Sequence, residues 1–210
     1  MTDTLTPFTF FPSSVYIVDQ PQFLPAVNVV ALEYLKAIKA SKPHQEPFYP
    51  VQTEGFFHEP VLGEFTKFIA QTAWNILRDQ GFDVEKLGTH FREMWCQELN
   101  QYQAHEEHVH SHGDQISGVY ILECPEGGSQ LAIHDPRPGK SQINLPETDK
   151  SAITYASRTA LLTAKPGRFY FFNSWLPHSI TRNPLQTPTR LVHFNLTVAA
   201  LPASSEAIVV

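Results

Sequence analysis

The densest group of side chains able to do chemistry is a run of histidines near the middle of the chain. Four of the ten histidines lie between His105 and His112, and an apolar run from Ile116 to Leu122 follows almost at once. Neutral imidazole is a good ligand for iron, zinc, copper and nickel. Four imidazoles this close together, bounded by predicted strands, favour a metal site over a surface loop of unrelated histidines.

The spacing of these histidines suggests which of them bind. His108 and His110 are two residues apart, so on a strand both side chains point to the same face. A third ligand must come from elsewhere, and His178, which follows an aromatic run, is the best candidate. Two ligands from one strand and one from a distant strand leave an open side for a cosubstrate and dioxygen, as in non-haem iron oxygenases. His112 with Asp114 is an alternative pair, disfavoured because the next strand begins so soon.

Charged residues further along the chain are predicted to face the cavity around the metal site. The stretch from His178 to Arg190 has room for a strand, a turn at residues 183–184 and a returning strand. Arg190 would then reach into the cavity and hold a carboxylate through two parallel hydrogen bonds, the alternative being a surface ion pair. Asp135 or Arg137 would line the cavity mouth and touch substrate, unless they only form a strand end and turn.

Other aromatic and imidazole side chains carry weaker signals. Trp95 and Trp175 are more often core residues than stacking platforms, although Trp175 is kept as a candidate substrate contact. His58, His90 and His193 are interpreted as structural.

The elements that must position these residues follow from hydrophobic periodicity. Apolar residues at helical spacing predict a helix over about 26–40 and a second one over the stripe from Leu62 to Leu77, capped by Gly81. Strands are expected at 92–99, 101–110, 116–123, 129–134, 159–163, 168–173, 178–182 and 190–198. This order predicts a mainly β (α+β) jelly roll with the N-terminal helices packed on one sheet. We expect one domain over residues 1–210, with helical support at about 24–90 and the barrel at about 91–200.

Composition restricts the function further. A formal charge of -6 argues against nonspecific nucleic-acid binding, because no basic stripe is available to neutralise phosphates. The N-terminus lacks the features of a signal peptide, and no stretch approaches the roughly 20 apolar residues of a membrane span. Two cysteines without a metal or redox spacing fit reduced thiols in a cytoplasmic protein.

Short motifs recur in order along nearly the whole chain. They are Phe10-Phe11-Pro12 with Val15-Tyr16, Trp95 before His108, Ile116-Ser117-Gly118-Val119-Tyr120, Asp135-Pro136-Arg137, Pro166-Gly167, Phe172-Asn173-Ser174-Trp175-Leu176-Pro177-His178, and Arg190 with Phe194-Asn195-Leu196. Together they resemble the iron(II)/2-oxoglutarate oxygenases of bacterial and phage type, relatives of the prolyl 4-hydroxylase-like group.

This resemblance implies a double-stranded β-helix that binds iron(II), 2-oxoglutarate and O2. His108 and His178 carry over as metal ligands. The implied cosubstrate contacts are Arg190, which grips the 2-oxoglutarate carboxylate, Tyr120 and Asn195. His110 stands where related enzymes outside the subgroup have an aspartate, so whether His110, or Asp114 and His112, completes the site stays open.

The expected function is a dioxygenase that hydroxylates an unidentified small-molecule or peptidyl substrate and releases succinate and CO2. The alternatives are a cupin-like protein that binds metal through three histidines without 2-oxoglutarate, and an inactive barrel used for binding. Arg190 discriminates between the first two, because a cupin does not need it. No nucleic-acid or membrane partner is expected, and the oligomeric state is open, with a homodimer among the options.

Overall fold

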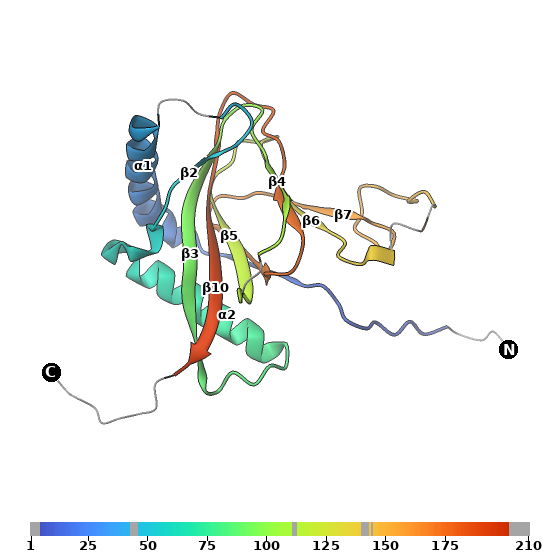
Figure 1. Ribbon diagram of the computed structural model, residues 1–210. Coiled ribbons are helices and arrows are strands. Elements are labelled where there is room, and N and C mark those ends of the chain that lie inside the picture. Colours follow the sequence, from blue (N-terminus) through green and yellow to red (C-terminus); the bar gives the residue numbers. More distant parts are fainter. Residues whose placement is uncertain (1–4, 43–45, 111–112, 140–142, 144, 202–210) are drawn as a thin grey trace.

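The computed structural model describes residues 5–42, 46–110, 113–139, 143 and 145–201 (Figure 1). The helices are α1 (Leu24–Ser41), α2 (Gly63–Asp79), and the short 3-10 turns η1 (Pro21–Phe23), η2 (Phe56–His58) and η3 (Pro60–Leu62). The strands are β1 (Val15–Asp19), β2 (Val51–Gln52), β3 (Leu87–Leu99), β4 (His105–His108), β5 (Ile116–Glu123), β6 (Leu131–His134), β7 (Thr159–Leu162), β8 (Arg168–Asn173), β9 (His178–Ile180) and β10 (Thr189–Ala200).

These strands form two antiparallel sheets. The larger sheet has the order β1-β8-β5-β10-β3-β2, and the smaller one has the order β4-β9-β6-β7. Helices α1 and α2 lie on one side of the larger sheet, and β4, β6 and β7 lie on the other (Figure 1). The predicted mainly β jelly roll, with helices packed on one sheet, is therefore confirmed.

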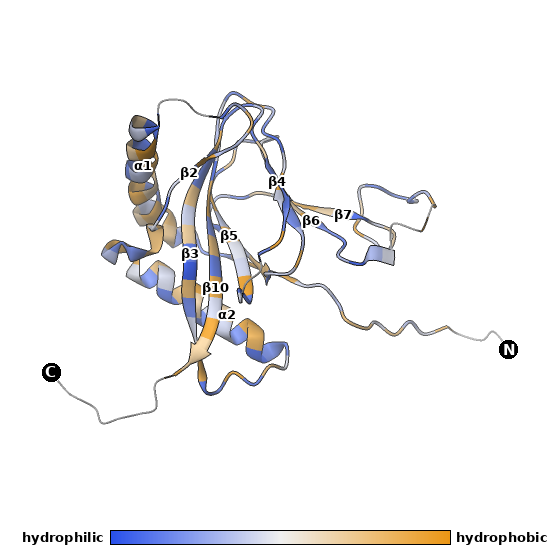
Figure 2. Cartoon of the chain, in the orientation of Figure 1, coloured by the Kyte–Doolittle hydropathy of each residue, from blue (hydrophilic) through white to orange (hydrophobic). Residues whose placement is uncertain are grey.

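The larger sheet is buried on both faces, because it separates two hydrophobic cores. On β10, Val192 and Phe194 pack into the core beneath the helices, whereas Leu191 packs into the core between the sheets. Apolar and polar residues alternate around both helices and along β3 and β10 (Figure 2). Each side chain of this kind contributes roughly 2 kcal/mol when it is fully buried.

Helix α2 follows its sequence pattern closely. The side chains on its buried face are Phe65, Ile69, Ala73, Ile76 and Leu77. Gly81 follows the helix with a φ of 90°, and its N–H donates to the Arg78 carbonyl at 2.9 Å. A positive φ costs glycine nothing, so the predicted C-terminal cap is confirmed.

Gly118 of β5 lies where two neighbouring strands leave no room for a side chain. A Cβ atom at this position would sit 2.4 Å from the Tyr170 carbonyl oxygen and 2.5 Å from the Phe194 ring. We expect Gly118→Ala to lower the free energy of unfolding by about 3 kcal/mol or more, because backbone cannot yield as a flexible side chain can. Urea denaturation measures this loss.

Gly63, at the start of α2, provides the matched control for that measurement. A Cβ atom there would meet nothing within 4 Å. Gly63→Ala should leave stability unchanged or raise it slightly, because alanine favours the helix. Equal urea midpoints for the Gly118→Ala and Gly63→Ala proteins would contradict the close packing described for β5.

Candidate metal centre

Four imidazoles meet between the two sheets. His108 ends β4, His110 follows it, His178 begins β9, and His193 lies in the middle of β10. Their candidate ligand atoms, one ring nitrogen from each, all lie within 4.8 Å of one another. The fold thus brings together the three histidines singled out from the sequence. It adds a fourth, His193, which was interpreted as structural.

Strand pairing explains why residues so distant in sequence converge. His108 lies directly opposite His178 in the β4–β9 pair. The backbone N–H of His110 donates to the Ser174 carbonyl at 2.9 Å, which fixes the chain beyond β4. His193 faces the same side of β10 as Asn195, two residues on, and this side is the interior of the barrel.

Backbone carbonyls orient two of the rings. Nδ1 of His108 donates to the Glu106 carbonyl at 2.7 Å, and Nδ1 of His178 donates to the Leu176 carbonyl at 2.9 Å. In a neutral ring, Nε2 then carries the free lone pair. Nε2 of His108 is buried without a hydrogen-bond partner. This is the arrangement of a metal-binding histidine whose other nitrogen is held by an outer partner.

His110 is held by a side chain instead. Its Nδ1 accepts a hydrogen bond from the Asn195 side-chain N–H at 3.0 Å, and the oxygen of the same amide accepts one from the Ser117 hydroxyl at 2.7 Å. Nε2 of His110 is buried and has no hydrogen-bond partner. Asn195 therefore contacts the cluster directly, at a position where it orients an imidazole.

The surroundings keep three of the four imidazoles, those of His110, His178 and His193, uncharged. Burial, assisted by the neighbouring His108, lowers the pKa of His110 to about 4 and also lowers the pKa of His178. Burial likewise holds the pKa of His193 well below its usual value. Neutral imidazoles are the form that binds metal. Converging imidazole nitrogens in a buried site, two of them without hydrogen-bond partners, are a donor set that fits a divalent ion such as iron(II).

These pKa shifts predict that the metal-free protein loses stability in mild acid. Burial is also the main cause that lowers the pKa of His105 to about 4. Between about pH 6.5 and pH 4 the unfolded chain binds more protons at His105 and His110 than the folded chain, so stability falls as pH falls. One such shift corresponds to on the order of 3 kcal/mol, since one pKa unit is about 1.4 kcal/mol.

Urea midpoints of chelator-treated protein, measured from pH 7 to pH 4, check this dependence. A His105→Gln protein should show a shallower decline, because one of the titrating groups is gone. A midpoint that stays constant down to pH 4 in the wild type would contradict the prediction.

Arg190 does not reach the histidines. Its Nε donates to Glu98 at 2.8 Å, and its Nη1 donates to Glu123. Glu98 is buried and also pairs with Lys39 of α1. Strand alternation puts Arg190 on the same face of β10 as Val192, which packs beneath the helices. The prediction that Arg190 points into the cavity is therefore wrong.

Two other candidate residues also lie away from the cluster. Tyr120 packs in the core beneath the helices, and its hydroxyl donates to the Gln20 carbonyl at 2.9 Å, so its assignment as a cosubstrate contact is not supported. Asp114 forms an ion pair with Arg92 at 3.4 Å. His112, its partner in the alternative ligand pair, lies outside the described residues.

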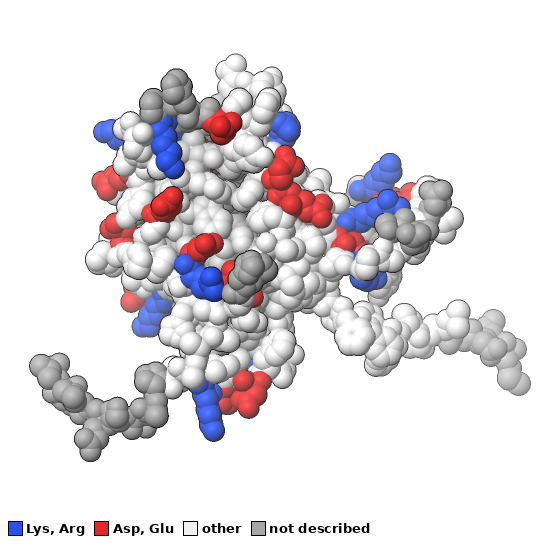
Figure 3. Space-filling view, in the orientation of Figure 1, with Lys and Arg blue, Asp and Glu red and all other residues white. Residues whose placement is uncertain are grey.

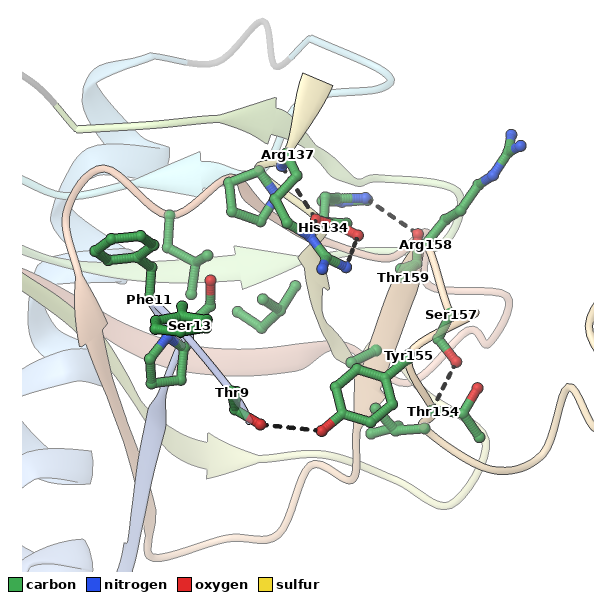
Figure 4. Close-up of a pocket in the computed structure, with 18 residues that line it drawn as sticks. Thr9, Phe11, Ser13, His134, Arg137, Thr154, Tyr155, Ser157, Arg158 and Thr159 are labelled. Carbon is green, nitrogen blue, oxygen red and sulfur yellow. Dashed lines mark hydrogen bonds and ion pairs between the residues drawn. The ribbon is translucent and has the colours of Figure 1, made fainter. Parts of the chain in front are cut away.

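A cavity of about 650 Å³ lies beside the cluster, between the N-terminal segment and the chain around β6 and β7. Asp135 and Arg137 both line it, and they are joined by two hydrogen bonds of 2.8 and 2.7 Å. Figure 4 shows Phe11 on one side of the cavity and Tyr155 on another. Leu176, whose carbonyl orients a histidine of the cluster, forms part of the wall.

The remaining candidate, Trp175, is about half exposed and does not line this cavity. Acidic and basic side chains are interspersed on the face of the molecule drawn in Figure 3. No helix in the described part of the chain combines the length and apolar character needed to cross a bilayer.

Two facing antiparallel sheets with imidazoles converging between them define the class of the protein as a metal-binding double-stranded β-helix. Solved structures of this fold are similar over most of their length. A prolyl-4-hydroxylase from Pseudomonas putida has a TM-score of 0.57 at 11% identity, covering 88% of this chain and 93% of its own. The viral collagen prolyl hydroxylase of Paramecium Bursaria Chlorella virus-1, in its 2-oxoglutarate complex, has a TM-score of 0.56 at 12% identity, covering 87% and 94%.

A third similar structure is HygX from Streptomyces hygroscopicus with nickel and 2-oxoglutarate bound, with a TM-score of 0.54 at 9% identity, covering 88% of this chain and 82% of its own. At these identities the likeness shows the shared fold. Residues 93–195 match the family described as "Putative 2OG-Fe(II) oxygenase". This barrel segment belongs to that family, which confirms the resemblance carried by the sequence motifs. No curated protein matches the chain.

Proposed function

We propose that the chain works as one domain of this family, an iron(II)- and 2-oxoglutarate-dependent oxygenase. The observation that carries the proposal is the convergence of His108, His110 and His178 inside a double-stranded β-helix. Two of these rings present a buried Nε2 without a hydrogen-bond partner. With iron(II), 2-oxoglutarate and O2 bound, a site of this class oxidises a substrate and releases succinate and CO2.

The protein's own groups would hold the ion and direct the substrate. The carbonyls of Glu106 and Leu176 fix the tautomers of two ligands, and Asn195 orients the third. We assign the substrate, a small molecule or a peptidyl group, to the cavity lined by Asp135 and Arg137. The observation that supports this assignment is Leu176, in the segment before β9, which forms part of the cavity wall.

Cosubstrate turnover provides the test, because the substrate is not needed for it. Protein loaded anaerobically with iron(II) is given 2-oxoglutarate and O2, and succinate and labelled CO2 are measured. The wild type should produce both, slowly alone and faster when a cell extract supplies substrate. A His108→Ala protein should produce neither. An iron-loaded wild type that never consumes 2-oxoglutarate, with or without extract, would overturn the proposal.

A second candidate function is a cupin-like metal-binding protein without 2-oxoglutarate chemistry. One observation favours it. Among the described residues, no lysine or arginine forms a hydrogen bond or a ring contact with the four histidines. Arg190 is engaged elsewhere, so the far carboxylate of 2-oxoglutarate has no partner identified there. Titration of the nickel(II)-loaded protein with 2-oxoglutarate distinguishes the two functions, because only the oxygenase should bind it.

We also propose that the protein works in the cytoplasm. Its two cysteines, Cys96 and Cys124, are both free thiols, and Cys96 is buried. Burial raises the pKa of the Cys96 thiol to about 12, so this thiol is unreactive and suits a reducing compartment.

A further inference from the structure

His193 lies with the other three histidines of the metal centre, although its spacing to them in the sequence does not predict this position. It is 1% exposed, and its ring stacks on Trp95 with centroids 4.4 Å apart and planes inclined by 6°. Its Nε2 lies 3.4 Å from Nε2 of His178. The stacking therefore aims this nitrogen at the point where the other imidazoles converge.

The separations within the cluster suit four ligands on one ion. Imidazole nitrogens lie roughly 2.1 Å from a bound ion such as zinc, so opposite ligands are about 4.2 Å apart and adjacent ones about 3 Å. The observed Nε2–Nε2 distance of 3.4 Å between His178 and His193 is close to the adjacent value. The largest separation within the cluster, 4.8 Å, exceeds the opposite value only slightly. Small side-chain movements are enough to seat an ion.

His193 nevertheless differs from the other three in how it is held. Nδ1 of His108 and of His178 each donate to a backbone carbonyl, and Nδ1 of His110 accepts from the Asn195 side-chain N–H. Nδ1 of His193 is buried and has no hydrogen-bond partner. Outer partners fix the orientation of a ligand histidine, so His193 is the least firmly held of the four at its outer nitrogen.

We propose that His193 is a fourth, displaceable ligand that binds the ion in the absence of 2-oxoglutarate and leaves when the cosubstrate binds. The proposal rests on the oxygenase function. An ion held by four imidazoles would have two of six positions left, and the two oxygens of a 2-oxo acid would take both. One imidazole would then have to leave to free a position, and His193, which has no outer partner, would be the easiest to release.

Cobalt(II) serves as the probe, with imidazoles counted by X-ray absorption and affinities measured by calorimetry. Wild-type protein should show four imidazoles, and three after 2-oxoglutarate is added. His193→Phe keeps a ring against Trp95 but has no donor. It should show three imidazoles in both states, bind cobalt(II) about tenfold more weakly, and bind 2-oxoglutarate about tenfold more tightly, because no ligand competes with it.

His90→Phe is the matched control, because His90 lies exposed on β3 outside the cluster and should behave as wild type. Three imidazoles in wild type without cosubstrate, with unchanged cobalt(II) affinity in His193→Phe, would overturn the inference and leave the proposed function intact. Four imidazoles that persist when 2-oxoglutarate is bound would overturn the displacement. A wild type that binds no cobalt(II), nickel(II) or iron(II) would overturn the proposed function as well. If His193→Phe fails to fold by circular dichroism, the wild-type counts alone decide.

Discussion

A His178→Ala protein should bind iron(II) or cobalt(II) at least 100-fold more weakly than wild type and produce no succinate from 2-oxoglutarate. His178 is fully buried, and it belongs to the smaller sheet, opposite His108. Loss of outer partners already weakens metal sites by roughly 10–100-fold, so loss of a ligand should cost more. Calorimetric titration with cobalt(II) measures the affinity, and circular dichroism verifies that the protein is folded.

His90→Ala removes an exposed imidazole and controls for the loss of a histidine as such. It should retain wild-type affinity and turnover. If His178→Ala bound cobalt(II) within about threefold of wild type, the early histidines would form the site without it. The convergence described between the sheets would then have no role in metal binding.

Arg190→Met should destabilise the protein by about 2 kcal/mol yet leave its affinity for 2-oxoglutarate within about twofold of wild type. Glu98 is 2% exposed, and burial alone would raise its pKa. Lys39 and Arg190 together hold this pKa below its usual value instead. Removing one of the two cations leaves the buried carboxylate incompletely paired, which is costly, although Lys39 limits the loss. Urea denaturation and calorimetry on nickel(II)-loaded protein measure the two effects.

Arg78→Met is the matched control for stability. Arg78 is exposed on α2 and lies 3.8 Å from Asp79, a contact of the kind that contributes little. Its guanidinium also lies 5.1 Å from the centroid of the Trp74 ring, a contact worth roughly 0.5–1 kcal/mol at an exposed site, so stability should stay within about 1 kcal/mol of wild type. A loss of 2-oxoglutarate affinity on the order of 100-fold in Arg190→Met would show that the arginine anchors the cosubstrate after all, because a charge-assisted pair is worth that much.

Hydrophobic periodicity predicted most of the architecture. The expected strands at 116–123 and 168–173 have the same bounds as β5 and β8, and α2 carries its apolar stripe toward the sheet. These elements bury one or both faces in a regular pattern, so the pattern alone determines them. The two-residue strand β2 was not among the expected strands, because it is too short to show any alternation.

The histidine cluster was only partly predictable. His108 and His110 share a face by simple alternation, and the spacing to His178 allowed it to join them. His193 was missed because β10 is buried on both faces, so its composition does not reveal which face lines the interior. The signal available was its spacing to Asn195, two residues on, which belongs to a family motif.

The prediction that Arg190 points into the cavity failed for the same physical reason. In a strand, neighbouring side chains point to opposite faces, so an argument from distance along the chain cannot decide between cavity and helix side. Arg190 and His193 are three residues apart and therefore face opposite ways. Once His193 is placed inside, the helix-side position of Arg190 follows.

The origin of the ligands in different layers has a mechanical consequence. His108 and His178 belong to the smaller sheet, whereas His193 belongs to the larger one. An ion held by all three would cross-link the two sheets. Metal binding should therefore raise the melting temperature in proportion to the logarithm of the free metal concentration. Release of His193 by the cosubstrate would remove the cross-link to the larger sheet. The two sheets would then be held together less tightly at the moment when the centre becomes reactive.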